Sequence, residues 1–292
     1  MKILLATDGS KFANDAAAFL ARLPHREGMD LTVMSVVPTM AILNHSEVKE
    51  WQRKYSEAQT KQANQNCLEV ERFFEGAVAS VEKVVTSGHP GSEIVSEARK
   101  RKSDFVVIGA MGHSLLERMM IGSVSDYVAT HASCSVLVVR PTGLGSKNHG
   151  HLNVCIAYDS SVQSRYAMVE LETFQWGADA HFDIVSGFGY PFNYMEVPIA
   201  VEMQGIENMF QKNLDAVAKE AQKVLPHVQP HLVQTLHIGE TLVEFTSNKK
   251  SDLIILGDTG YGLLGRAVLG SVSRYVLRHA SCSVWIARKP RH

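Results

Sequence analysis

The chain contains one long pattern twice, and this duplication limits its fold more than any other feature. Residues 122–140 and 270–288 share thirteen of nineteen residues, and equivalent positions lie 148 residues apart. A period of this length indicates a duplicated domain rather than a solenoid of short repeats. The 292 residues are enough for two ordinary domains, and the stretch between the halves is rich in Gly, Pro, Ser and Asn. We predict a first domain at 1–140, a linker at 141–151 and a second domain at 152–290.

Each half alternates apolar runs of strand length with longer amphipathic stretches typical of helices. Strands are expected at 2–7, 31–37, 81–86, 104–109, 135–140, 152–158, 180–187, 231–237, 252–257 and 283–288. Helices are expected at 10–23, 46–76, 91–102, 122–131, 161–176, 204–225, 239–250 and 270–280. The predicted fold class is therefore α/β, with two repeated, doubly wound, parallel five-stranded sheet domains. In such sheets, ligands bind beyond the carboxyl ends of the strands.

A glycine pattern follows the fourth expected strand of each half, in the form Gly-x-x-Gly, nine residues, Gly-Ser. Its members are Gly109, Gly112, Gly122 and Ser123 in the first half, and Gly257, Gly260, Gly270 and Ser271 in the second. A strand, a glycine loop and a helix start together present backbone N–H groups to a phosphate, and glycine lets the ligand approach closely. The serine hydroxyls can cap the helix or donate to a phosphate oxygen. The alternative is that both loops are tight turns and helix caps that bind nothing.

A carboxylate ends the first expected strand of each half, at Asp8 and at Asp159. A carboxylate is a poor partner for phosphate and a good acceptor for ribose hydroxyls. If the first and fourth strands are neighbours, each carboxylate lies beside the glycine loop of its own half. The combination predicts a nucleotide. The alternative is that Asp8 is a turn residue or an N-cap before the helix that starts at Ser10.

These features resemble the universal stress protein family in its tandem form, with two family domains in one chain. The resemblance covers nearly the whole chain and rests on the opening 3–10, on the glycine pattern of both halves, and on the closing His-Ala-Ser-Cys-Ser-Val. It implies the adenine nucleotide alpha hydrolase-like fold and ATP as the ligand. Carried over by position, the residues implied to bind the nucleotide are Asp8, Val36, Gly109, Gly112, Gly122 and Ser123.

Several neighbours of these residues are further candidates. Val124 and Ser125 continue the helix start and could add N–H or hydroxyl donors, and His113 directly follows Gly112 and could reach a phosphate, although it could equally be a surface residue. The equivalent candidates of the second half are Asp159, Gly257, Gly260, Gly270, Ser271, Val272 and Ser273.

The second half departs from the family pattern at three positions. Tyr158 replaces a small residue and could fill the space of the adenine, and Gly187 stands where Val36 stands in the first half. Asp258 replaces Ala110 and places a negative charge in the phosphate loop. That charge would oppose a polyphosphate unless a cation, Arg266 or Arg274 compensates it. We therefore expect the first domain to bind ATP and the second to bind weakly or not at all.

The charge and the apolar runs exclude some classes of protein. The formal net charge of −1 predicts no general attraction to nucleic acid or membrane, and no stretch approaches the ~18 apolar residues of a membrane span. The opening apolar run meets Asp8 too early for a signal peptide, so a cytoplasmic location is expected. No nucleophile–base pair, no P-loop and no metal-ligand spacing is visible, so we predict neither catalytic residues nor a metal site.

The leading functional interpretation is an ATP-binding regulatory protein of the stress response, read by an unidentified protein partner. Slow ATP hydrolysis or autophosphorylation at Ser123 or Ser125, with Mg²⁺ bridging the phosphates, remains open. The first alternative is a stress-response scaffold that binds no nucleotide, and an ATP-dependent ligase or transferase ranks third. The closing strands 135–140 and 283–288 are expected to pair the domains as an internal pseudo-dimer, because exposed edge strands require partners. Whether two chains pair further is left open.

Overall fold

The computed structural model describes residues 1–23, 28–39, 46–76, 79–112, 121–141, 151–189, 200–259 and 269–289. The strands of the first half are β1 (Lys2–Ala6), β2 (Met29–Pro38), β3 (Ala79–Gly88), β4 (Phe105–Gly109) and β5 (Ser135–Val139). Those of the second half are β6 (Asn153–Ala157), β7 (His181–Phe188), β8 (Val228–Gln234), β9 (Leu253–Gly257) and β10 (Ser283–Ala287).

The helices of the first half are α1 (Lys11–Arg22), α2 (Ser46–Glu71), α3 (Pro90–Arg101) and α4 (Ser123–His131), with a short 3₁₀ turn, η1 (Arg72–Phe74), after α2. The second half has α5 (Val162–Leu171), α6 (Ala200–Ala221), α7 (Ile238–Asn248) and α8 (Ser271–His279). Strands and helices alternate in both halves, which confirms the predicted α/β class.

All ten strands belong to one sheet with the order β3-β2-β1-β4-β5-β10-β9-β6-β7-β8. Within each half the strands are parallel, and β1 lies between β2 and β4, as the sequence interpretation required. The halves join where β5 pairs antiparallel with β10, with Val138 opposite Val284 and Val136 opposite Ile286. The two closing strands therefore cover each other's edges, and the two five-stranded sheets become one continuous sheet.

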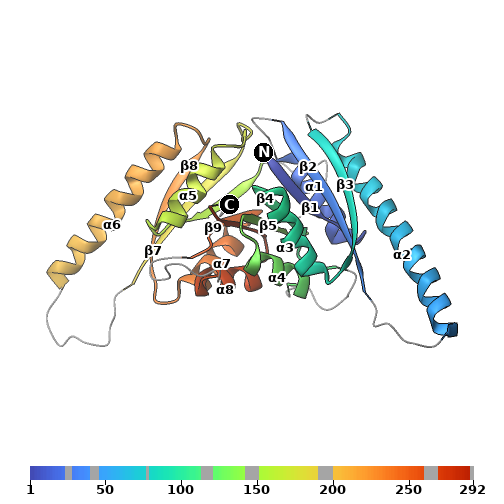
Figure 1. The fold of residues 1–292 in the computed structure, drawn as a ribbon. Helices are drawn as coiled ribbons and strands as arrows, with labels where there is room; N and C mark the ends of the chain where they lie inside the picture. The colour runs from blue at the N-terminus through green and yellow to red at the C-terminus, as the bar shows by residue number, and fades with distance from the viewer. Residues whose placement is uncertain are drawn as a thin grey trace.

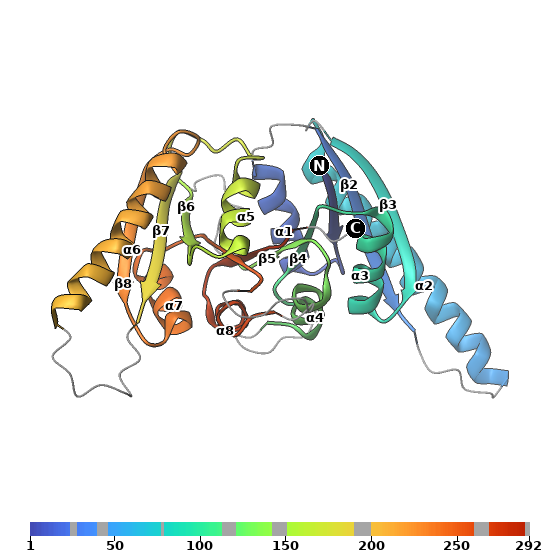
Figure 2. The ribbon, with the colours of Figure 1, turned by 60° about the vertical axis from the view of Figure 1, so that its left-hand side comes forward.

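Helices cover both faces of this sheet, and each face has its own core. One core joins the sheet to α1, α2, α5 and α6 through residues such as Leu20, Cys67 and Leu214, and the other joins it to α3, α4, α7 and α8. Figure 1 shows α2 and α6 at opposite ends of the molecule and α4 beside α8 near its middle, and Figure 2 shows the same arrangement after a turn of 60°. The long helices thus flank the two ends of the sheet, and the junction of the halves lies between them.

The core continues across the junction. The rings of Phe105 and Phe174 meet Trp285 edge-on, at centroid distances of 4.8 and 5.1 Å, and all three side chains are fully buried. Phe105 belongs to the first half and the other two to the second. Because buried aromatic rings contribute large apolar areas, this cluster ties the halves together more firmly than a surface contact would.

Several element boundaries differ from those expected from the sequence: α2 ends at Glu71 instead of 76, α6 is Ala200–Ala221 instead of 204–225, and β2 and β3 are longer than predicted. Two further differences have a visible cause. Strand β8 is Val228–Gln234 instead of 231–237, because it is the edge strand of the sheet, where Pro230 costs no ladder hydrogen bond. Helix α5 ends at Leu171 instead of 176. There the chain turns back, buries Phe174 and places the Trp176 Nε1 atom 2.9 Å from the carbonyl oxygen of Leu171, to which it donates.

Candidate functional site

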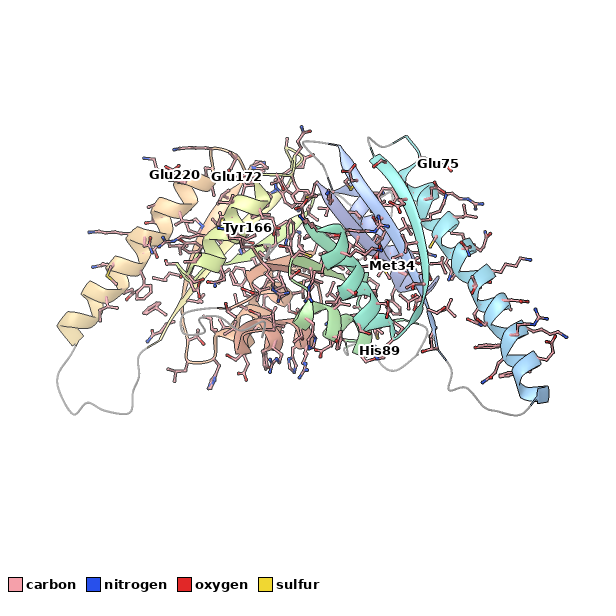
Figure 3. The ribbon with its side chains drawn as sticks, in the orientation of Figure 1. Met34, Glu75, His89, Tyr166, Glu172 and Glu220 are labelled. Carbon is pink, nitrogen blue, oxygen red and sulfur yellow. The ribbon has the colours of Figure 1, made fainter. Side chains whose placement is uncertain are left out.

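A cavity of about 410 Å³ lies at the carboxyl ends of β1, β2 and β4 in the first half. Eight of the nine candidate residues of this half line it: Asp8, Val36, Gly109, Gly112, Gly122, Ser123, Val124 and Ser125. The ninth, His113, lies outside the described residues. The wall also includes Met34 of β2, which Figure 3 labels in the first half together with His89, the residue directly before α3.

The start of α4 supplies backbone hydrogen-bond donors to the cavity. Gly122 is the N-cap of α4, and its own N–H is held by the carbonyl oxygen of Ala110 at 2.7 Å. The first helical hydrogen bond runs from Asp126 N–H to Gly122 O. The amides of Ser123, Val124 and Ser125 therefore precede the intrahelical ladder and stand at the positive end of the helix dipole. This is a site suited to an anion.

Two glycines of the pattern are needed for different reasons. A Cβ atom on Gly112 would lie 2.5 Å from Oδ2 of Asp8, so the loop passes directly over that carboxylate. A Cβ atom on Gly109 would lie 2.7 Å from the backbone of Phe12, so this glycine lets α1 pack against the end of β4. Gly112 therefore shapes the cavity, whereas Gly109 would be required in this fold with or without a ligand.

The hydroxyl of Ser125 is held by the fold. It donates to the carbonyl oxygen of Gly109 at 2.7 Å, and Ser273 makes the same 2.7 Å bond to Gly257. Each hydroxyl hydrogen thus fixes its helix to the end of a strand, so of the two kinds of donor considered for Ser125 the hydroxyl is already engaged in this structure. What Ser125 can still offer a ligand is its backbone amide.

Asp8 is a turn residue and also lines the cavity. Its Oδ1 atom accepts a hydrogen bond from Ser10 N–H at 2.9 Å, while the N-cap of α1 is Ser10, whose hydroxyl accepts from Ala13 N–H at 3.3 Å. Asp159 repeats this arrangement with Ser161 N–H at 3.0 Å. Asp8 can therefore be a turn residue and a carboxylate facing a ligand at the same time. The N-cap of α1 is Ser10 and not Asp8.

A second cavity, of about 340 Å³, lies at the equivalent place in the second half. It is lined by the candidates Asp159, Gly257, Gly270, Ser271, Val272 and Ser273, whereas Gly260 lies outside the described residues. Tyr158 also lines it and is only 6% exposed. A Cβ atom on Gly187 would overlap Cδ1 of Ile238, so that side chain occupies the space over the strand end that corresponds to Val36. The helix-start end of this cavity resembles that of the first one, and Tyr158 and Ile238 border its other end.

The charge of Asp258 is neutralised by a residue that the sequence interpretation did not name. Its Oδ2 atom lies 3.0 Å from Nε of Arg288, and both side chains are buried. Arg274 instead donates to the carbonyl oxygen of Leu269 at 3.0 Å, and Arg266 lies outside the described residues. Arg288 stands at the end of the closing strand, distant in sequence from Asp258. The repeat could have drawn attention to Arg288, because both copies of the repeated stretch end in an arginine, Arg140 in the first half and Arg288 in the second.

A buried carboxyl group lies at the junction of the halves, away from both cavities. Glu170 of α5 is 8% exposed, and its carboxyl oxygens lie 2.6 and 2.8 Å from the hydroxyl of Ser135 and 2.9 Å from Nε1 of Trp285. Burial raises the pKa of Glu170 to about 8, against the opposing effect of these two hydrogen bonds. No local pattern in the sequence points to this group, because the equivalent residue of the first half, Phe19, is an ordinary buried residue of α1.

The described part of the chain holds neither a membrane-spanning helix nor a cluster of metal-binding side chains. No helix within it is long and apolar enough to cross a membrane. No group of three or more His, Cys, Asp or Glu side chains within it is arranged to hold a metal ion.

The fold and the first cavity define a class: doubly wound α/β proteins with a glycine loop and a helix start at the carboxyl ends of their strands. Within this class, a sequence model of the universal stress protein family matches residues 1–140 and 152–288. The chain therefore belongs to the universal stress protein family, and the resemblance noted in the sequence is confirmed.

Two relatives found by sequence each match about half of the chain, and one solved structure matches nearly all of it. Universal stress protein MJ0531 of Methanocaldococcus jannaschii is 29% identical over 139 residues, which are 48% of this chain and 81% of that protein. Universal stress protein YxiE of Bacillus subtilis is 30% identical over 146 residues, covering 48% of this chain and 98% of that protein. The crystal structure of a universal stress protein from Archaeoglobus fulgidus covers 98% of both chains with a TM-score of 0.62 at 18% identity, which shows the same overall fold.

Proposed function

We propose that the first half binds ATP or another adenine nucleotide, with its phosphates at the start of α4 and its ribose beside Asp8. One observation carries the proposal: a carboxylate acceptor and three helix-start amides meet in one cavity, and the loop between them passes so close to Asp8 that a Cβ atom at Gly112 would collide with it. The cavity volume of about 410 Å³ falls in the usual range for small-molecule sites. The apolar wall formed by Met34, Val36 and Ile94 suits a flat base.

The bound nucleotide would act as a regulatory ligand. Binding only to the folded protein stabilises it by mass action, and the liganded state would be read by a protein partner in the stress response. A Mg²⁺ ion accompanying the nucleotide would supply positive charge to the phosphates. The residues around the cavity supply binding and orientation, and we assign catalysis to none of them. We further propose, from the sequence, that residues 141–151 form a linker between two domains. We also propose that the protein is located in the cytoplasm.

We propose that the second half binds nucleotide more weakly than the first. Tyr158 and Ile238 narrow the end of its cavity that would receive a base, while Gly270, Ser271 and Ser273 keep the phosphate end. Asp258 does not oppose an anion in the way the sequence suggested, because Arg288 neutralises it. Weak binding would therefore come from shape and not from charge.

A proline scan of the two helix starts tests the proposal. Proline fits the first position of a helix and removes one backbone N–H, and the extended conformation of Gly122 (ψ 153°) and Gly270 (ψ 160°) allows proline to follow. We expect Ser123→Pro to lower ATP affinity about tenfold or more in equilibrium dialysis, because one charge-assisted hydrogen bond is lost.

Ser271→Pro is the matched control and should leave the tight site unchanged. Ser123→Ala, which removes only the hydroxyl, should bind ATP nearly as the parent does. Equal ATP binding by Ser123→Pro and the parent would refute the phosphate site.

One observation favours a second function, that of a scaffold without nucleotide. Gly109 and Gly257 are both required by helix packing, against the backbone of Phe12 in one case and against Gln163 in the other. Part of the glycine pattern would therefore exist without any ligand. The scaffold interpretation predicts no saturable ATP binding by the whole chain in the same dialysis experiment.

A further inference from the structure

Helix α2 lines the first cavity with a row of side-chain amides. Gln59, Gln62 and Asn66 all contribute to its wall, together with Ala63 between them. Their spacing of three and four residues places them on one face of the helix. Figure 1 shows α2 running along the outer side of β2 and β3, the two strands that it contacts.

These amides come from a helix that packs on the opposite face of the sheet from α4. Helix α2 packs on one face of the sheet, in the core that contains Cys67, and α4 packs on the other face, in the core that contains Val128. The cavity lies between these two helices, at the carboxyl ends of β1, β2 and β4. A ligand with its phosphates at the start of α4 and its ribose beside Asp8 would therefore bring the ribose side of its nucleoside part next to α2, because Asn66 of this helix packs on Gly9.

Asn66 is the fixed member of the row. It is 7% exposed and packs on Gly9, where a Cβ atom would lie 2.5 Å from its side chain and where the backbone has φ +78°. Asn66 Oδ1 accepts a hydrogen bond from Nε2 of Gln62 at 3.0 Å, which orients the Gln62 amide. Within the described residues, Oε1 of Gln62 and the amide of Gln59 have no hydrogen-bond partner in the protein. Donor and acceptor groups are thus available on the cavity wall.

The second half serves as an internal control. Asn213 of α6 donates to the hydroxyl of Ser160 at 2.7 Å, and Ser160 follows Asp159 as Gly9 follows Asp8, so Asn213 is the counterpart of Asn66. Gln62 and Gln59 lie four and seven residues before Asn66. The residues four and seven places before Asn213 are Met209 and Ile206, whose side chains are 60% and 41% exposed. Among the described residues, none from α6 lines the second cavity. The amide row is therefore a property of the first site and not of the repeated fold.

We propose that the Gln59 and Gln62 amides recognise the nucleoside part of the nucleotide and make the first site bind a nucleoside triphosphate more tightly than triphosphate alone. A glutamine amide offers one acceptor and two donors, and it complements the N6 donor and N7 acceptor of adenine or the hydroxyls of a ribose. This inference rests on the proposed function, because it assigns the selectivity of the same site. In the second half, methionine and isoleucine at these positions cannot make such bonds.

The test transplants the second-half residues into the first half. The double variant Gln59→Ile/Gln62→Met is compared with the parent by calorimetric titration with two probes, ATP and inorganic tripolyphosphate. We expect the variant to bind ATP about tenfold more weakly, the loss typical of about two neutral hydrogen bonds, and to bind tripolyphosphate as the parent does. The reciprocal variant Ile206→Gln/Met209→Gln is the matched control and should not change ATP binding at the first site. All variants should keep the parent's melting temperature without ligand, since the altered side chains are partly or largely exposed.

Three results would overturn the inference, and they are distinguishable. If the parent binds ATP and the double variant binds it equally well, the amides form only a solvated face of α2, while the proposed function stands. If the variant loses affinity for both probes alike, it perturbs the site in general and not its nucleoside part. If the parent binds neither probe, the proposed function fails and this inference fails with it.

Discussion

Glu170 shows how much a single residue can affect the stability of the junction between the halves. In its protonated form, the carboxyl can donate to Ser135 while accepting from Trp285, so every polar atom of the group is satisfied. In its ionised form it places a charge in a nearly water-free core. Burial thus favours the neutral acid and raises the pKa of Glu170 to about 8, although the hydrogen bonds from Ser135 and Trp285 act in the opposite direction.

Glu170 is expected to make the protein less stable as the pH rises from about 5 to 8. In this window the folded protein keeps a proton that the unfolded chain has released, because the pKa of Glu170 is about 8 when folded and 4.5 otherwise. The unfolding free energy should then fall by up to about 1 kcal/mol per pH unit from this group. Glu170→Gln keeps both hydrogen bonds without a charge, so its unfolding free energy should lack this contribution.

The check is urea unfolding of the parent and Glu170→Gln at several pH values between 5 and 8. The difference between the two free energies should grow with pH in favour of the variant. A constant difference across the window would show that Glu170 does not titrate there.

At the scale of elements, the arginine that ends the second closing strand connects β10 to a helix of the other half. Arg288 donates to the carbonyl oxygens of Ala129, at 3.2 Å, and Ala132, at the carboxyl end of α4, and pairs with Asp258. A cation at this end of a helix also interacts favourably with the dipole. The same helix faces the first cavity with its other end, so Arg288 helps to hold the helix that supplies the proposed phosphate site.

We predict that Arg288→Met destabilises the protein by about 3–5 kcal/mol, because it leaves Asp258 buried and without its cation. The double variant Asp258→Ala/Arg288→Met should recover part of this loss, since alanine is the natural residue at the equivalent position 110. A double-mutant cycle measured by chemical unfolding gives the coupling between the two residues. A coupling near zero would mean that the buried pair contributes nothing beyond its separate parts.

Elements were more predictable from the sequence than contacts between the halves. Strand and helix periods, together with the repeat, gave the class, the order of elements and the place of the cavity. The pairing of Asp258 with Arg288 and the burial of Glu170 depend on side chains brought together by the junction, which no local pattern records. The boundaries of β8 and α5 were missed because an edge strand tolerates Pro230 and because Trp176 folds back on its own helix.

At the scale of the whole molecule, the two halves share one sheet, one buried aromatic cluster and the Glu170 contact. Separation would expose the edge of β5 and remove Trp285 from Phe105. Because an exposed edge strand and an exposed aromatic core favour association, the isolated first half needs a substitute partner.

We expect a protein of residues 1–141 alone to form a homodimer in which β5 of one copy replaces β10 for the other. Sedimentation of this fragment should give twice the fragment's mass, and Val138→Lys, placed opposite Val284 in the full chain, should abolish the dimer. A fragment that is monomeric and as stable as the full chain would contradict this expectation, and would show that the junction is dispensable for folding.

The proposed regulatory role requires one nucleotide bound at the start of α4 in the first half. Calorimetric titration of the full chain with Mg-ATP tests this most directly, because it gives affinity and stoichiometry together. We predict one tight site per chain, which Ser123→Pro weakens and Ser271→Pro leaves intact. No saturable heat with the parent protein, or a tight site that only Ser271→Pro removes, would contradict the account.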